Sequence, residues 1–194
     1  MPYTRPNEDG GKLWLRFPQV PESDRLKHYQ KAFTHVVALS NSATANIAKA
    51  ELLQGIGGLT GTSITPSTHL RGEGAVLIGT SKMPQIAELQ LRTDLSSLGD
   101  EGYAVERVAK GGTVLTAVVA NTDIGTLYGT YALLRHLQSH KPIDDLLLAA
   151  TPKIQHRVLN HWDNLDGTAE VRVVSDVALA RDGKADHASA FGGA

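Results

Sequence analysis

Cysteine is absent from the 194-residue sequence, and aromatic residues make up only 5% of it. The absence of cysteine excludes disulfide bonds and metal sites built on thiolates, although it does not identify a cellular compartment. The scarcity of aromatic residues predicts a core made mostly of leucine, valine, isoleucine and alanine. With 41% hydrophobic residues, the chain can form one domain with a tail or two small domains.

An excess of one charge is also missing, because 19 lysine and arginine residues face 20 aspartate and glutamate residues. Without a basic field to neutralise phosphates, we predict no nucleic-acid partner. The longest apolar run, at residues 146–150, is far shorter than the roughly 20 residues of a membrane helix, so no membrane partner is predicted. No signal peptide is visible, which makes the cytoplasm the default location and leaves a periplasmic or extracellular parent protein open.

Alternating strand and helix patterns are present instead. Strands are expected, in chain order, at residues 13–17, 35–39, 75–79, 103–108 and 114–120. Helices are expected at residues 45–54, from Pro84 and at 125–137, with a polar helical turn or loop at 24–31. The last two strands flank Gly111-Gly112, which predicts a hairpin. This order predicts an α/β domain in which one sheet is covered by helices.

Two glycine-containing segments invite a nucleotide-binding interpretation, which their positions do not favour. Gly55 follows a helical pattern rather than preceding one, so we predict that it ends the helix and that residues 57–61 form a loop. Residues 79–82 lack the earlier glycines of a phosphate loop, and Ser81 is predicted to cap the next helix. No nucleotide cofactor is therefore predicted. No metal site is predicted either, because His136 and His140, four residues apart, lack the intervening glutamate of the zincin pattern.

Residues 160–168 read Asn-His-Trp-Asp-Asn-Leu-Asp-Gly-Thr, and several other segments of the chain match the pattern of the same protein family. These segments lie at residues 8–17, 99–103, 120–129, 133–135, 152–154 and 157–159. Together they resemble glycoside hydrolase family 67, the α-glucuronidases that debranch xylan, over about residues 8–168. The string at 160–168 is the most specific part of this resemblance.

The resemblance implies a fold and a domain order. It implies an α/β accessory domain of the hexosaminidase type at residues 8–150. A linker and the first strand of a truncated (β/α)8 barrel would follow at residues 151–168. Residues 169–194 depart from the family pattern, and we interpret them as an atypical tail, disordered or non-native, such as a truncated gene, a frameshift or an added segment produces.

The resemblance also implies a function for the parent enzyme. That enzyme would remove (4-O-methyl)glucuronic acid from xylo-oligosaccharides by inverting hydrolysis, without a cofactor, and would be a homodimer. Inverting hydrolysis needs two carboxyl groups about 6.5–9.5 Å apart, and a barrel that carries them takes about 250 residues. Only 35 residues follow Leu159. We therefore assign no catalytic residue and expect an inactive fragment that self-associates through its uncovered apolar surface.

Three residues are the candidates for sugar binding. By the resemblance, Trp162 would form an apolar wall for the glucuronic acid ring, with His161 and Asp163 beside it. Each has a structural alternative: Trp162 as a buried core residue, His161 as a structural histidine, and Asp163 as a turn former. The segment at residues 125–129 is expected to build a domain interface rather than an active site.

Two other functions stay open from the residues alone. The chain could be a free-standing carbohydrate-binding or protein-interaction module. It could also be the accessory domain of a different, hexosaminidase-type glycosidase, which shares the Gly-x-x-Tyr-Gly pattern at residues 125–129 but should lack the string at 160–168.

Overall fold

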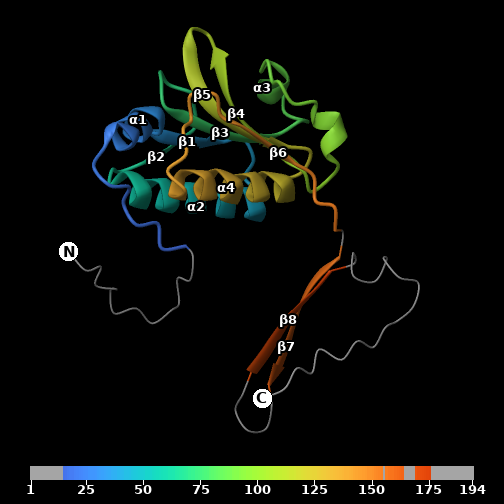
Figure 1. The fold of residues 1–194 in the computed structure, drawn as a ribbon. Helices are drawn as coiled ribbons and strands as arrows, with labels where there is room; N and C mark the ends of the chain where they lie inside the picture. Colours follow the sequence, from blue (N-terminus) through green and yellow to red (C-terminus); the bar gives the residue numbers. More distant parts are fainter. Residues whose placement is uncertain (1–14, 155, 164–168, 176–194) are drawn as a thin grey trace, which may run out of the picture. The chain divides into compact units, whose positions relative to one another are not determined.

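The computed structural model describes the backbone at residues 15–154, 156–163 and 169–175, and side chains at 15–154 and 156–158 (Figure 1). The chain divides into two compact units, Met1–Thr151 and Pro152–Ala194. The first unit holds a six-stranded sheet with its helices, and the second holds a two-stranded hairpin. The prediction of an α/β domain with one helix-covered sheet is confirmed for the first unit.

The sheet of the first unit is mixed, with the strand order β2-β1-β3-β5-β4-β6. Its strands are β1 (His35–Ala38), β2 (Thr65–Ser67), β3 (Ala75–Thr80), β4 (Tyr103–Lys110), β5 (Thr113–Ala120) and β6 (Leu147–Ala150). Strands β2, β1, β3 and β5 run parallel to one another, whereas β4 is antiparallel to both β5 and β6. All six residues of β3 are buried, as expected for a central strand with both faces covered.

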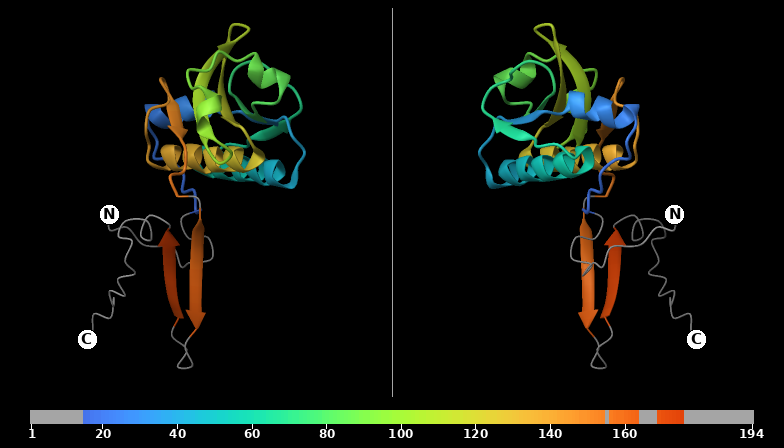
Figure 2. Two further views of the ribbon diagram at one scale, coloured as in Figure 1. Left: turned by 90° about the vertical axis from the view of Figure 1, so that its right-hand side faces the viewer. Right: turned by 90° about the vertical axis from the view of Figure 1, so that its left-hand side faces the viewer.

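Helices cover both faces of this sheet. Helices α2 (Ala43–Thr60) and α4 (Asp123–Gln138) lie side by side under one face, and α3 (Pro84–Ala87) lies over the other (Figure 2). Helix α1 (Asp24–Ala32) packs into the same apolar cluster as α2 and α4. The short 3-10 helix η1 (Leu95–Leu98) joins α3 on the opposite face. Adjacent strand residues alternate between the clusters, with Val105 in the first and Ala104 in the second.

Local signals placed several elements correctly. The predicted hairpin is present, with Lys110 opposite Thr113 and with positive φ angles of 59° and 79° at Gly111 and Gly112. The hydroxyl of Ser42 accepts a hydrogen bond of 3.1 Å from the backbone N–H of Ala45 and so caps α2. The strands predicted at 35–39 and 75–79 and the helix predicted at 125–137 are confirmed as β1, β3 and α4.

The predicted end of the second helix at Gly55 is wrong. Helix α2 continues to Thr60 and ends at Gly61, whose φ of 67° gives the left-handed C-cap. A Cβ atom at Gly55 would lie 2.5 Å from Cδ2 of Leu134 in α4. Glycine at this position therefore lets α2 and α4 approach each other, and residues 57–60 are helical rather than a loop.

Three further expectations for the first unit are wrong. Residues 15–16 form a turn and Phe17, with φ of 47°, lies beyond it, so the described part of the strand predicted at 13–17 is absent. No strand was expected between residue 137 and the linker, but β6 lies there, at an edge position that leaves Leu147 44% exposed and hides the strand pattern. Ser81 donates a hydrogen bond of 2.9 Å to Oδ1 of Asn121, and Met83 occupies the N-cap of α3 instead.

The second unit is an antiparallel hairpin of β7 (Arg157–Asp163) and β8 (Ala169–Ser175), with Trp162 opposite Glu170 in the register. A strand at the predicted place is thus present. Strands of a (β/α)8 barrel are parallel to their neighbours, so this pairing does not confirm the start of a barrel. Within the segment interpreted as an atypical tail, residues 169–175 form β8, and residues 176–194 lie outside the described residues.

Across the described part of the chain, no helix is both long and apolar enough to span a membrane.

Gly125 in the first turn of α4 lies against the sheet. A Cβ atom there would be 2.4 Å from the carbonyl oxygen of Gly102 and 2.6 Å from Cβ of Ala120. The first is a backbone atom of the residue before β4 and the second is the Cβ atom of a residue in β5, so both have little freedom to move away. Glycine at position 125 therefore lets the start of α4 pack tightly against the sheet.

We predict opposite effects for two glycine-to-alanine changes in helices. Gly125→Ala should lower the free energy of unfolding by about 1–3 kcal/mol, because the new methyl group overpacks the contact with the sheet. Gly57→Ala should raise it by about 0.5–1 kcal/mol, because its Cβ meets only the carbonyl oxygen of Thr62, at 3.4 Å, and alanine favours the helix. Urea denaturation followed by circular dichroism measures both. Equal stability of the two variants would contradict the packing argument.

Candidate functional site: a tyrosine-lined groove on helix α4

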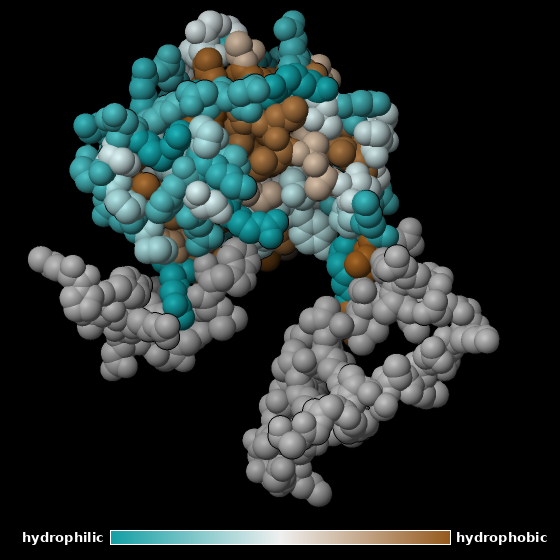
Figure 3. Space-filling view, viewed as in Figure 1, coloured by the Kyte–Doolittle hydropathy of each residue, from teal (hydrophilic) through white to brown (hydrophobic). Residues whose placement is uncertain are grey.

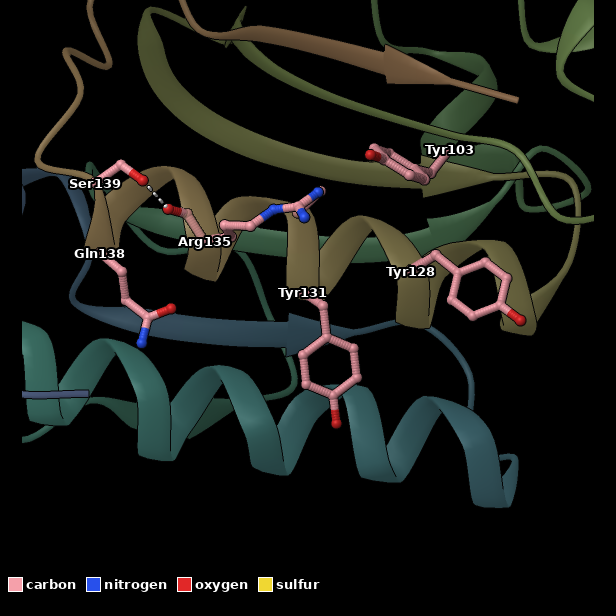
Figure 4. A pocket seen from close by; sticks show the side chains of 7 residues that line it. Tyr103, Tyr128, Tyr131, Arg135, Gln138 and Ser139 are labelled. Atoms are coloured by element: carbon pink, nitrogen blue, oxygen red, sulfur yellow. Dashed lines mark hydrogen bonds between the residues drawn. The ribbon is translucent and has the colours of Figure 1, made fainter. Parts of the chain in front are cut away.

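A groove of about 620 Å³ opens between α4 and the start of β4 (Figure 4). It is lined by Tyr103, Tyr128, Tyr131, Ala132, Arg135, Gln138 and Ser139. Its size lies within the range of about 300–1,000 Å³ that is common for binding pockets. Figure 3 shows an apolar area, bordered by polar residues, in the middle of the face of this unit that carries α4 and β6.

The spacing of residues along α4 separates a groove side from a core side. Tyr128, Tyr131, Arg135 and Gln138 follow one another at steps of three, four and three, which places them on one stripe of the helix. The core side carries fully buried leucines at 133, 134 and 137. Tyr131 is partly buried, and it both packs against the apolar cluster that holds these leucines and lines the groove.

Tyr103 is the residue of the sheet that lines the groove. It is the first residue of β4 and lies on the same side of the sheet as Val105, facing α4. A Cβ atom at Gly129 would come within 3.2 Å of Cβ of Tyr103, so the absence of a side chain at Gly129 lets this tyrosine approach the helix. The segment at residues 125–129, expected at a domain interface, thus contributes Tyr128 and the close packing beside Tyr103.

Arg135 supplies the cationic part of the groove. Its side chain extends from α4 on the side where Tyr103 lies, whereas Tyr131 extends toward α2 (Figure 4). The guanidinium forms no ion pair or side-chain hydrogen bond with any residue of the described part of the chain. The hydroxyl of Ser139 donates a hydrogen bond of 2.9 Å to the carbonyl oxygen of Arg135, which satisfies one of the last carbonyls of the helix.

The hydroxyl of Tyr131 is held in its neutral form. Burial raises the pKa of Tyr131 above its ordinary value, and the negative charge of Glu51 and a hydrogen bond to it raise this pKa further. Among the described residues that line the groove there is no carboxylate. The groove can therefore offer aromatic faces, a permanent cation and neutral polar groups, which suit a partner surface, but it offers no acid–base pair.

A buried carboxyl group outside the groove also has a structural role. Glu106 in β4 is 0% exposed and accepts backbone hydrogen bonds of 2.8 Å from Arg92 and 2.9 Å from Thr93. The Nε atom of Arg92 lies 3.7 Å from the same carboxyl group. Glu106 thus ties the loop after α3 to the sheet. Among the described side chains, no group of three histidine, aspartate or glutamate residues could hold a metal ion.

The three residues predicted to bind sugar lie in the second unit. His161, Trp162 and Asp163 follow one another in β7, where their backbones pair with residues 169–171 of β8. Their side chains lie outside the described residues, so their roles stay predictions. Sequence reasoning missed Arg135 and Gln138, although their spacing from Tyr128 along one helix stripe was a signal that could have indicated them.

The sequence profile described as "Glycosyl hydrolase family 67 N-terminus" matches residues 13–133. Alpha-glucuronidase A of Emericella nidulans is 32% identical over 167 residues, which are 81% of this chain and 18% of that protein. A probable alpha-glucuronidase A of Aspergillus niger is 27% identical over 165 residues, 84% of this chain and 19% of that protein. The chain therefore spans less than a fifth of the length of these curated relatives.

Among solved structures, the chain is similar to a GH138 enzyme targeting pectin rhamnogalacturonan II. The TM-score is 0.45 and the sequence identity is 17%, with 63% of this chain and 16% of that chain covered.

We predict that Glu51→Gln moves the pKa of Tyr131 back toward its ordinary value. The change removes the negative charge of Glu51, but burial remains, so the pKa should stay above the ordinary value. A pH titration followed by carbon-13 NMR of the tyrosine ring measures it. The pKa of Tyr29, which burial raises independently of Glu51, serves as the internal control.

The sign of the linked stability effect follows from the direction of this shift. Because the folded state raises the pKa of Tyr131, the stabilisation is present below the ordinary pKa and is lost as the pH rises through the folded pKa. Glu51→Gln should therefore reduce the loss of stability at alkaline pH. An unchanged Tyr131 pKa in the variant would contradict the assigned contact.

Proposed function

Because the chain belongs to glycosyl hydrolase family 67 through its N-terminal domain, we propose that it is the accessory domain of an α-glucuronidase. The match over residues 13–133, which reaches from before α1 into α4, carries this proposal. The relatives' name, alpha-glucuronidase, supports an enzyme that releases glucuronic acid. That the enzyme removes (4-O-methyl)glucuronic acid from xylo-oligosaccharides is part of the proposal. The inverting course of the hydrolysis is part of the proposal.

The domain itself is proposed to lack catalysis. Hydrolysis of a glycosidic bond by this route needs two carboxyl groups facing each other across the bond. Among the described side chains, Glu106 is the fully buried carboxyl group, and its oxygens accept hydrogen bonds from two backbone amides. We place the catalytic acid and base in a further part of the enzyme, corresponding to the more than four fifths of each relative that this chain does not cover.

The hairpin of the second unit has a proposed role in that further part. Strand β7 would become the first strand of a (β/α)8 barrel, following a hexosaminidase-type accessory domain. This arrangement requires β7 to exchange its antiparallel partner β8 for parallel neighbours. His161, Trp162 and Asp163 would then lie at the carboxyl end of a barrel strand, where barrel enzymes bind their substrates.

The groove on α4 is proposed as the surface that docks on the catalytic domain. Tyrosine and arginine are the residue types enriched at the energetic centres of protein interfaces, and the groove brings together Tyr103, Tyr128, Tyr131 and Arg135. The groove offers no acid–base pair, which argues for recognition rather than chemistry. The occupant is the remainder of the enzyme, because the related N-terminal regions belong to chains more than five times as long as the match.

We expect the isolated chain to release no glucuronic acid from substituted xylo-oligosaccharides. A chimera in which its residues 15–154 replace the aligned segment of the Emericella nidulans relative should retain hydrolysis, because the accessory domain would support the catalytic domain. Release of glucuronic acid is measured against a blank, and circular dichroism verifies folding. Turnover by the isolated chain, or a folded chimera without activity, would contradict the proposal.

The groove, when no catalytic domain covers it, is expected to drive self-association of the isolated chain. Tyr131→Ser and Arg135→Ser should shift light-scattering masses toward the monomer, because they remove the aromatic and cationic contacts of the groove. Lys27→Ser, on the exposed side of α1, is the matched control and should leave the masses unchanged. A monomer at high concentration in the unmodified chain would count against this expectation.

A further inference from the structure

A second hollow, of about 210 Å³, lies between α1 and the β4–β5 hairpin. It is lined by His28, Lys31, Ala32, Glu73, Gly74, Arg107 and Val114. It shares no lining residue with the groove on α4. Its size suits a small molecule or ion rather than a long oligosaccharide, because pockets for larger ligands usually exceed about 300 Å³.

One lining residue, Arg107, and its partner in the strand register, Thr116, each have a buried polar atom without a hydrogen bond to any described residue. Among the described residues, Nη1 of Arg107 and Oγ1 of Thr116 are both buried without any hydrogen bond. Arg107 and Thr116 are directly opposite each other in the register of β4 and β5, so both side chains lie on the same face of the sheet. Buried polar groups are hydrogen-bonded in the great majority of cases. A ligand with acceptor oxygens would supply the partner that Nη1 of Arg107 lacks.

The residues that line the hollow carry a small positive excess, while Asp144 adds a carboxylate just outside the lining. Nζ of Lys31 lies 3.8 Å from a carboxylate oxygen of Glu73, on the exposed rim, and these two charges balance each other. Nδ1 of His28 lies 3.6 Å from Oδ1 of Asp144. Arg107 remains as a half-buried cation whose pKa burial lowers, while Asp144 and Glu73 raise it. With histidine neutral, the lining residues carry one net positive charge.

We propose that this hollow binds a small oxyanion of the carboxylate or phosphate type. The guanidinium of Arg107 is the main donor, because its planar N–H groups match the two oxygens of such a group. Lys31 on α1 supplies a second cationic group at the rim. The proposal is independent of the proposed function, since it concerns a different part of the domain and needs no catalytic domain.

The test is a titration of the isolated chain with sodium phosphate and, separately, with sodium glucuronate, at constant ionic strength set with sodium chloride. Nitrogen-15 NMR spectra report binding through shifts of the amides around the hollow, and they show at the same time whether each variant is folded. We expect saturable binding of at least one of the two anions. Phosphate alone would indicate a phosphate site, and glucuronate alone would indicate a carboxylate site.

Variants identify the residue responsible. Arg107→Gln should weaken the binding by about tenfold or more, because it removes the charge and the paired donors. Arg107→Lys should weaken it less, since the charge remains, and it covers the case in which the glutamine variant does not fold. Lys27→Gln, a cation on α1 outside the hollow, should bind as the unmodified chain does. Absence of saturable binding, or equal binding by a folded Arg107 variant, would overturn the proposal.

Discussion

The close approach of α4 to the β4–β5 hairpin is the contact on which the other features of the domain depend. α4 lies so close to the sheet at Gly125 that a side chain there would not fit, and the lack of a side chain at Gly129 lets Tyr103 lie against the helix. This contact turns the leucine stripe of α4 into the core and leaves its tyrosine and arginine stripe facing outward. A helix held further from the sheet would separate Tyr103 from that stripe, and the groove would not form.

Strand β4 connects the two surfaces that we assign to recognition. Tyr103 and Arg107 lie four residues apart on this strand, so both point to the same side of the sheet. Tyr103 reaches the groove on α4, whereas Arg107 reaches the hollow beside α1. Glu106, between them on the other face, binds the loop after α3 and holds the strand in place. One strand thus carries both proposed recognition surfaces on one side and a structural anchor on the other.

Errors in the sequence-based predictions occurred where distant residues decide the local structure. Gly55 has the character of a helix end, but it packs against Leu134, about eighty residues further along the chain, and the helix continues. Strand β6 escaped prediction because it is an exposed edge strand stabilised by pairing with β4 rather than by its own pattern. The hairpin at Gly111-Gly112 was predicted correctly because its signal is entirely local.

The amino-acid sequence by itself determined the family, the α/β class, the main strands and helices and the absence of a local nucleotide-binding motif. These properties depend on short patterns and on strings such as residues 160–168, which are readable without any knowledge of contacts. Only the tertiary structure decided which side chains meet: Tyr103 with the stripe of α4, Glu106 with the amides after α3, and Arg107 with α1. The reason is physical, because burial and charge environment arise from residues far apart in sequence that the fold brings together.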